Sequence, residues 1–86
     1  MPEISRFYGV IIRMYFADHN PPHFHVEYGG EETLISINTL GVIHGKLPPR
    51  ILGMVVEWAA LHQDELLADW QKAADSEPLA KIDPLP

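Results

Sequence analysis

Three of the five histidines in this 86-residue chain lie within seven residues, in the segment 18–26, DHNPPHFHV. Successive side chains of a β-strand point to opposite faces, so a strand beginning at His23 places His23 and His25 on the same face. Two imidazoles at this spacing lie roughly 6–7 Å apart along the strand, close enough to bind one metal ion or one anion. The pattern therefore predicts a binding site on one face of a sheet.

The histidine segment suits two kinds of chemistry. Neutral imidazole is a ligand for zinc, copper, nickel and iron, so His19, His23 and His25 are candidate ligands of a divalent metal such as zinc or nickel. Imidazole also titrates near neutral pH and can transfer protons there. In that interpretation His23 and His25 are candidate catalytic residues, together with Arg13 and Tyr15, which the strand pattern places on the same face. The residues leave open whether the protein is an enzyme.

Structural interpretations are open for the same residues. Exposed sheet faces carry histidines that have no function, and His19 would then cap the proline turn through its side chain. Arg13 sits opposite His25 or Glu27 in either register of the first two strands, so an Arg13–Glu27 ion pair would account for both charges.

The elements that would position these residues follow from the apolar pattern. Alternation predicts four strands, at about 7–16, 23–28, 32–38 and 42–44. The Gly29-Gly30 pair is typical of a primed hairpin turn. The resulting register gives the second strand an apolar face toward the core and a polar face away from it: Phe24, Val26 and Tyr28 on the first, and His23, His25 and Glu27 on the second.

A long helix follows the strands. A proline pair suits its first turn, and apolar residues recur at helical spacing from Arg50 to about Ala74. The predicted fold class is α+β: an antiparallel β-meander of about four strands with one long C-terminal α-helix packed on one face. Residues 1–76 would form a single domain, and residues 77–86 an extended, proline-containing tail that contributes little to the core.

Two further histidines lie outside the segment. His62 falls within the apolar stripe of the helix, one turn after Trp58, and is interpreted as a buried histidine hydrogen-bonded to the sheet or to Asp69. His44 belongs to the shortest predicted strand, where periodicity does not decide which side chain faces the core.

Composition excludes several classes of protein. The chain has no cysteine, so it has neither a disulfide framework nor a cysteine-based zinc site. No apolar run is long enough to cross a membrane, and the N-terminus lacks the pattern of a signal peptide, so we expect a cytoplasmic protein. The formal net charge of −6 argues against nonspecific nucleic-acid binding and favours a basic protein partner or a small ligand.

The chain resembles the bacterial domain-of-unknown-function family 4160 (DUF4160). The resemblance rests on the segments 2–9, 12–15, 18–26, 47–50 and 57–58, and its most specific part is the string His-x-Pro-Pro-His-x-His. The family has no established reaction. Its members often lie beside a second small family of unknown function, number 2442, and the pair is proposed as a toxin–antitoxin-like module. The resemblance implies that this chain is the toxin-like member, with Arg13, His19, His23 and His25 as working residues.

The leading functional hypothesis is a small module that works with a partner protein and whose histidine face binds a metal, a phosphate or RNA. The partner would be a family 2442-like neighbour or a second copy of the chain. One alternative is a non-catalytic metal- or ligand-binding domain. The other is a protein–protein interaction module whose histidines are incidental. Ile11, Tyr15 and Leu34 on the outer sheet face, with the tail, are the predicted binding surface.

Overall fold

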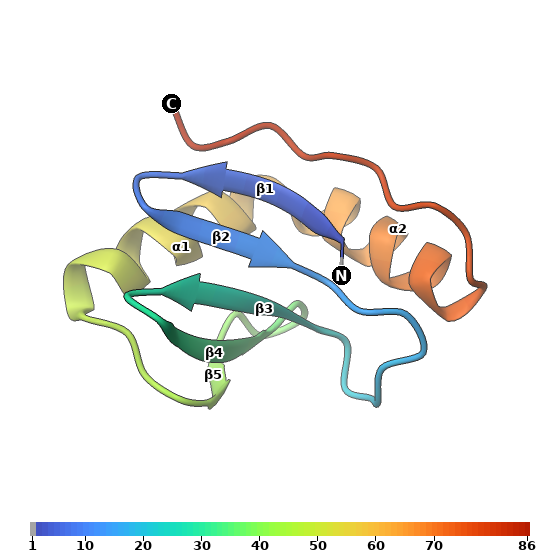
Figure 1. The fold of residues 1–86 in the computed structure, drawn as a ribbon, viewed down its shortest axis with the longest axis horizontal. Helices are drawn as coiled ribbons and strands as arrows, with labels where there is room; N and C mark the ends of the chain where they lie inside the picture. Colours follow the sequence, from blue (N-terminus) through green and yellow to red (C-terminus); the bar gives the residue numbers. More distant parts are fainter. Residues whose placement is uncertain (1) are drawn as a thin grey trace.

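The computed structural model describes residues 2–86 and consists of one antiparallel sheet with two helices across one face (Figure 1). The sheet has five strands in the order β1-β2-β3-β4-β5, so every strand pairs with its neighbour in sequence. The strands are β1 (Glu3–Phe7), β2 (Val10–Arg13), β3 (His23–Tyr28), β4 (Glu31–Ser36) and β5 (Val42–His44), and the helices are α1 (Pro49–Leu61) and α2 (Gln63–Ala74). The predicted α+β class and antiparallel meander are confirmed.

The sheet has one strand more than expected because the chain turns at Tyr8-Gly9. Both residues adopt positive φ, +46° at Tyr8 and +80° at Gly9, as a primed two-residue hairpin requires. The turn pairs Phe7 with Val10. The strand predicted at 7–16 is therefore divided, because Phe7 ends β1 and β2 begins at Val10. Ile4, Phe7, Val10 and Ile12 of this hairpin are buried in the core.

The hairpin β3–β4 has the predicted register. Phe24 pairs with Ile35, His25 with Leu34 and Val26 with Thr33, around a turn at Gly29-Gly30. The side chains of Phe24, Val26 and Ile35 are fully buried in the core. The alternation of β3 therefore directs His25 to the opposite face of the sheet.

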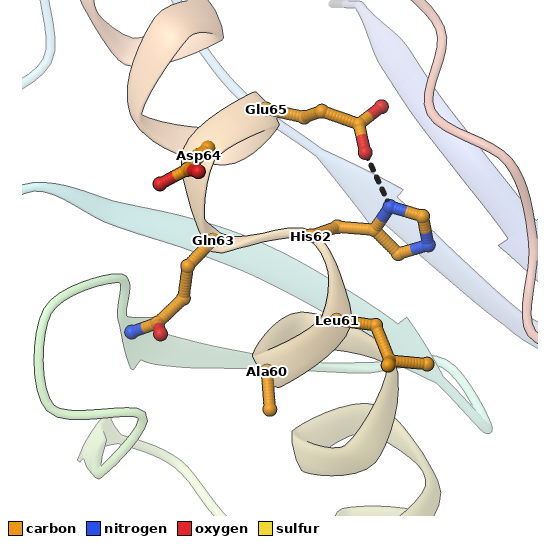
Figure 2. A pocket seen from close by; sticks show the side chains of 6 residues that line it. All are labelled: Ala60, Leu61, His62, Gln63, Asp64 and Glu65. Carbon is orange, nitrogen blue, oxygen red and sulfur yellow. Dashed lines mark hydrogen bonds and ion pairs between the residues drawn. The ribbon is translucent and has the colours of Figure 1, made fainter.

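The predicted long helix is two helices that meet at His62. The His62 N–H donates to Ala59 O at 3.1 Å, one residue short of the α-helical spacing, and the His62 backbone leaves helical geometry at φ −124°, ψ 24°. Figure 2 shows the junction, where His62 Nδ1 lies 2.5 Å from Glu65 Oε1. Gln63 Nε2 donates to Ile37 O at 2.8 Å and ties the start of α2 to the chain just after β4. The ring of His62 was expected to hydrogen-bond to the sheet or to Asp69, and its partner is Glu65 instead.

The tail, residues 77–86, forms neither helix nor strand and runs beside β1, as Figure 1 shows. Ile82 is 4% exposed and belongs to the core, and its N–H donates to Ile4 O at 2.8 Å. Trp58 Nε1 donates to Asp83 O at 2.8 Å. The expectation that the tail contributes little to the core was therefore wrong. Within residues 2–86, neither helix is long and apolar enough to span a membrane.

Candidate metal centre

Two elements bring together one carboxylate and two imidazoles. His23 and His25 lie at alternate positions of β3, and Asp18 comes from the loop between β2 and β3. This loop is anchored to the second helix, because the Ala17 N–H donates to Ala73 O at 3.4 Å. One ligand atom from each of Asp18, His23 and His25 lies within 4.8 Å of the other two. The loop therefore folds back so that its carboxylate faces the strand histidines.

A backbone carbonyl fixes the position of one proton on the His23 ring. Its Nδ1 lies 2.8 Å from Pro21 O, and because a carbonyl only accepts, Nδ1 carries the proton. Nε2 lies 3.1 Å from Asp18 Oδ2 but makes no aligned hydrogen bond with any residue in 2–86. The side chain is 7% exposed. In neutral His23, a buried lone pair thus faces a carboxylate oxygen, an arrangement that a cation between the two atoms would stabilise.

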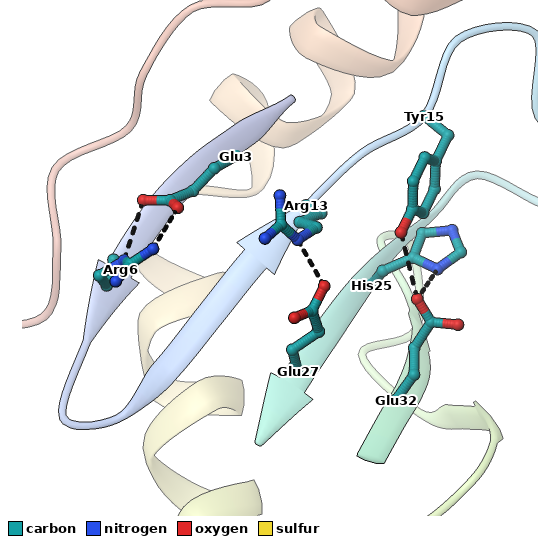
Figure 3. Close-up of polar contacts among 7 residues, drawn as sticks. All are labelled: Glu3, Arg6, Arg13, Tyr15, His25, Glu27 and Glu32. Atoms are coloured by element: carbon teal, nitrogen blue, oxygen red, sulfur yellow. Dashed lines mark hydrogen bonds and ion pairs between the residues drawn. The ribbon is translucent and has the colours of Figure 1, made fainter. Parts of the chain in front are cut away.

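His25 contacts a carboxylate through each ring nitrogen. Nε2 lies 3.0 Å from Asp18 Oδ2, and Nδ1 lies 3.1 Å from Glu32 Oε2. Figure 3 shows that the Tyr15 hydroxyl reaches the same Glu32 oxygen, at 3.4 Å. The Tyr15 ring packs edge-on against the imidazole, with 4.3 Å between ring centroids. A carboxylate only accepts, so the contact with Asp18 is a hydrogen bond when Nε2 carries the proton. If the proton were on Nδ1 toward Glu32 instead, Nε2 would offer its lone pair to a metal ion beside Asp18.

Two shifted pKa values belong to this group. Burial raises the pKa of Asp18, but the hydrogen bond from His25, the backbone N–H of His19 and the charges of His23 and His25 outweigh it and hold the pKa below the ordinary value. Asp18 is therefore a carboxylate at neutral pH, the form that binds metals. Burial, with the Glu32 carboxylate, raises the pKa of Tyr15, so Tyr15 stays protonated and donates to Glu32.

The predicted site residues separate into those that join the group and those that do not. His23 and His25 join it, whereas His19 is exposed and contributes only its backbone N–H, 2.8 Å from Asp18 Oδ1. Arg13 pairs with Glu27, the structural explanation considered for both charges (Figure 3). Sequence reasoning missed Asp18 as a ligand, although it is the one carboxylate within the segment 18–26.

The histidine face is more enclosed than a sheet face turned away from a helix would be. His23 is 5% and His25 8% exposed. The indole of Trp70, on the second helix, lies 5.3 Å from the His23 ring, centroid to centroid. His25 is covered instead by Tyr15 and the loop carboxylate. The site is therefore a partly closed compartment at the end of β3.

The arrangement could hold a metal ion. Two imidazoles and one carboxylate form a donor set used for zinc and for non-haem iron. Metal-binding histidines in proteins usually donate their second N–H to a backbone carbonyl or a carboxylate, which fixes the ring and the tautomer. Pro21 O and Glu32 occupy these two positions here.

Comparison with known proteins gives one match. The family model named Domain of unknown function (DUF4160) matches residues 9–71, a range that contains Asp18, His23, His25 and Glu32. No curated protein and no solved structure matches the chain. The family model covers more than half of the chain, and the chain therefore belongs to the DUF4160 family.

Proposed function

We propose that this domain binds a divalent transition-metal ion through Asp18 Oδ2, His23 Nε2 and His25 Nε2. The observation that carries the proposal is the buried His23 Nε2, which faces the Asp18 carboxylate at 3.1 Å without an aligned hydrogen bond. Buried polar atoms in proteins are almost always paired, so this atom requires an explanation. A cation shared by the imidazole and the carboxylate supplies one.

The surrounding contacts support the same interpretation. Pro21 O accepts from Nδ1–H of His23, and the Glu32 carboxylate would accept from Nδ1–H of His25 once a metal ion replaced the proton on Nε2, so both Nε2 atoms would bind the ion from the side of Asp18. The lowered pKa of Asp18, set by burial and the opposing hydrogen bonds and charges, keeps the third ligand ionised. Asp18 is thereby in the form that binds a metal, and a metal ion at His25 Nε2 would displace the proton that this atom shares with Asp18.

The donor set indicates which ion is bound. Calcium and magnesium take mostly oxygen ligands, whereas imidazole nitrogen favours zinc, nickel, copper and iron. Zinc and nickel are the proposed ions. Three protein ligands leave one tetrahedral position open, which is the arrangement of catalytic rather than structural zinc sites. A water or a substrate oxygen would occupy that position.

The proposal is tested on metal-stripped protein by calorimetric titration with ZnCl₂ or NiCl₂ at pH 7.5. At 100 times the dissociation constant, a ligand specific for the folded state adds about 2.7 kcal/mol of stability. In a thermal melt at that metal concentration, the melting temperature of a domain of this size should rise by more than about 10 °C.

The variants that test it are His23→Ala and two matched controls. His23→Ala should abolish the heat of binding, while His44→Ala and His19→Ala, which remove exposed histidines outside the group, should bind metal like the original protein. Unchanged melting with metal, or equal affinity in His23→Ala and His44→Ala, would remove the metal proposal.

The toxin-like role in a two-gene system is a separate proposal that rests on the family resemblance, as does the neighbour-encoded partner. Inducible expression with and without the neighbouring gene measures it directly. Growth arrest relieved by the neighbour would support the role, and unaffected growth would contradict it. Combining the assay with His23→Ala shows whether the metal group takes part.

A further inference from the structure

The two edges of the sheet differ in whether another segment covers them. The edge strand β1 is covered by the tail, whose Ile82 N–H donates to Ile4 O. The opposite edge strand, β5, pairs only with β4, and no other strand within residues 2–86 lies beyond it. Its three residues are all exposed, with Val42 43% and Ile43 45% accessible. An open edge presents unpaired backbone donors and acceptors that can pair with another strand.

The open edge is held firmly in place. Gly45, directly after β5, adopts φ +80°, and a Cβ atom there would lie 2.6 Å from Glu32 O. Only glycine therefore allows the chain to leave β5 so close to the backbone of β4. The Thr33 hydroxyl donates to Lys46 O at 3.2 Å and fixes the next residue. An edge ordered in advance loses little conformational freedom when a partner binds.

The chain segment that contains β5 is basic, although the whole chain is acidic. The formal net charge is −6, yet residues 33–56 contain no Asp or Glu. Lys46 and Arg50 are exposed and form no ion pair with any described residue, whereas Arg6 and Arg13 pair with glutamates on the outer sheet face. The open edge is thus apolar along the strand and basic beside it.

We propose that β5 is a docking edge for an extended, acidic segment of a partner protein, which would extend the sheet by one antiparallel or parallel strand. Addition of a peptide to a sheet edge is a common recognition mode, in which backbone hydrogen bonds supply affinity and side chains supply specificity. Acidic side chains of the segment would face Lys46 and Arg50, and its apolar side chains would cover Val42 and Ile43.

Charge distinguishes this partner from two other occupants. A second copy of the chain pairing through β5 would bring the basic groups of the two copies together, and such like-charge contacts are unfavourable. A nucleic acid would meet the same basic groups, but the net charge of −6 opposes its approach.

The test uses a short capped peptide of alternating glutamate and valine, titrated into the full isotope-labelled chain. The amide resonances of residues 42–44 should shift, and these amides should become protected from hydrogen exchange. Lys46→Glu should weaken binding about tenfold. The matched control Lys81→Glu makes the same charge change at an exposed lysine of the tail and should bind the peptide like the original protein.

Further arms separate strand addition from simple charge attraction. The same peptide N-methylated at alternate residues cannot form the ladder and should not bind, and a lysine–valine peptide should not bind either. Equal binding of the N-methylated or lysine peptide, or no shift at residues 42–44, would overturn the proposal. A β5-dependent dimer of the protein alone, or RNA binding at the same amides, would assign the edge to one of the other occupants instead.

Discussion

Two aspartates, the partly buried Asp18 and the buried Asp69, show how neighbouring groups decide the protonation state of a carboxyl. The Asp18 side chain is 21% exposed, and Oδ2 lies within 3.1 Å of a nitrogen of both His23 and His25. Asp69 on α2 is 1% exposed, and Oδ1 accepts one hydrogen bond, from the Ala80 N–H at 2.9 Å. Its Oδ2 has no hydrogen-bond partner within residues 2–86.

The two groups shift in opposite directions. Burial raises the pKa of Asp69, and the Ala80 N–H and the Lys72 charge only partly oppose it. Burial also raises the pKa of Asp18, but there the hydrogen bonds and imidazole charges prevail and the pKa is lowered. Burial alone therefore favours a neutral carboxyl, whereas hydrogen-bond donors and nearby positive charge favour the carboxylate. Asp69 attaches the tail to α2, and Asp18 serves the candidate metal centre.

The largest expected effect tests the structural role of the tail, which Asp69 attaches to α2. Deleting residues 77–86 removes the buried Ile82 and the acceptor for Trp58 Nε1, and should lower the free energy of unfolding by about 3 kcal/mol or more. Urea denaturation measures this loss. Metal affinity in the folded fraction should be unchanged, so a deletion that leaves stability intact would contradict the role assigned to the tail.

A matched pair of substitutions tests whether the two aspartates differ in function. Asp18→Asn should weaken zinc binding about 100-fold, or about 2.7 kcal/mol, because it replaces an ionised ligand by a neutral amide. Asp69→Asn makes the same chemical change outside the group and should leave zinc affinity unaltered. Calorimetry measures the zinc affinity of both variants. Equal affinities would contradict the assignment of Asp18, and not Asp69, to the metal site.

A substitution of Glu32 tests whether this carboxylate supports metal binding through His25. Glu32→Gln should weaken metal binding about tenfold, because the Gln amide no longer fixes the His25 tautomer as a carboxylate does. Glu27→Gln is the control, since Glu27 pairs with Arg13 on the same face of the sheet. A loss of affinity that is the same in both variants would indicate a general effect of surface charge.

The smallest expected effect is the pH dependence of stability without metal. The native state holds the Asp69 proton more tightly than the unfolded state, so this group lowers stability as pH rises from about 4 toward its raised pKa. Asp18 releases its proton more readily when folded, so it adds stability above about pH 4 that is lost as pH falls toward its lowered pKa. Unfolding of the two Asn variants from pH 3 to pH 7 should therefore differ from the original protein with opposite slopes.

Local sequence was sufficient for the features that neighbouring residues control. The glycine pair at 29–30 and the two-residue period of the flanking strands specify the β3–β4 register, because a slip by one residue would turn every core side chain outward. The same period predicted that His23 and His25 share a face. The glycine at position 9 also indicates a turn, but the apolar residues that follow it led to the prediction of one continuous strand at 7–16.

The other features depended on contacts between distant parts of the chain. Asp18 reaches the histidines because its loop is hydrogen-bonded to Ala73, and no pattern within the loop specifies that contact. Ile82 joins the core because β1 offers an edge beside it. The sequence by itself thus determined the α+β meander and the shared face of the two histidines. Only the tertiary structure decided which carboxylate meets them and how deeply they are buried, since both depend on segments far apart in sequence.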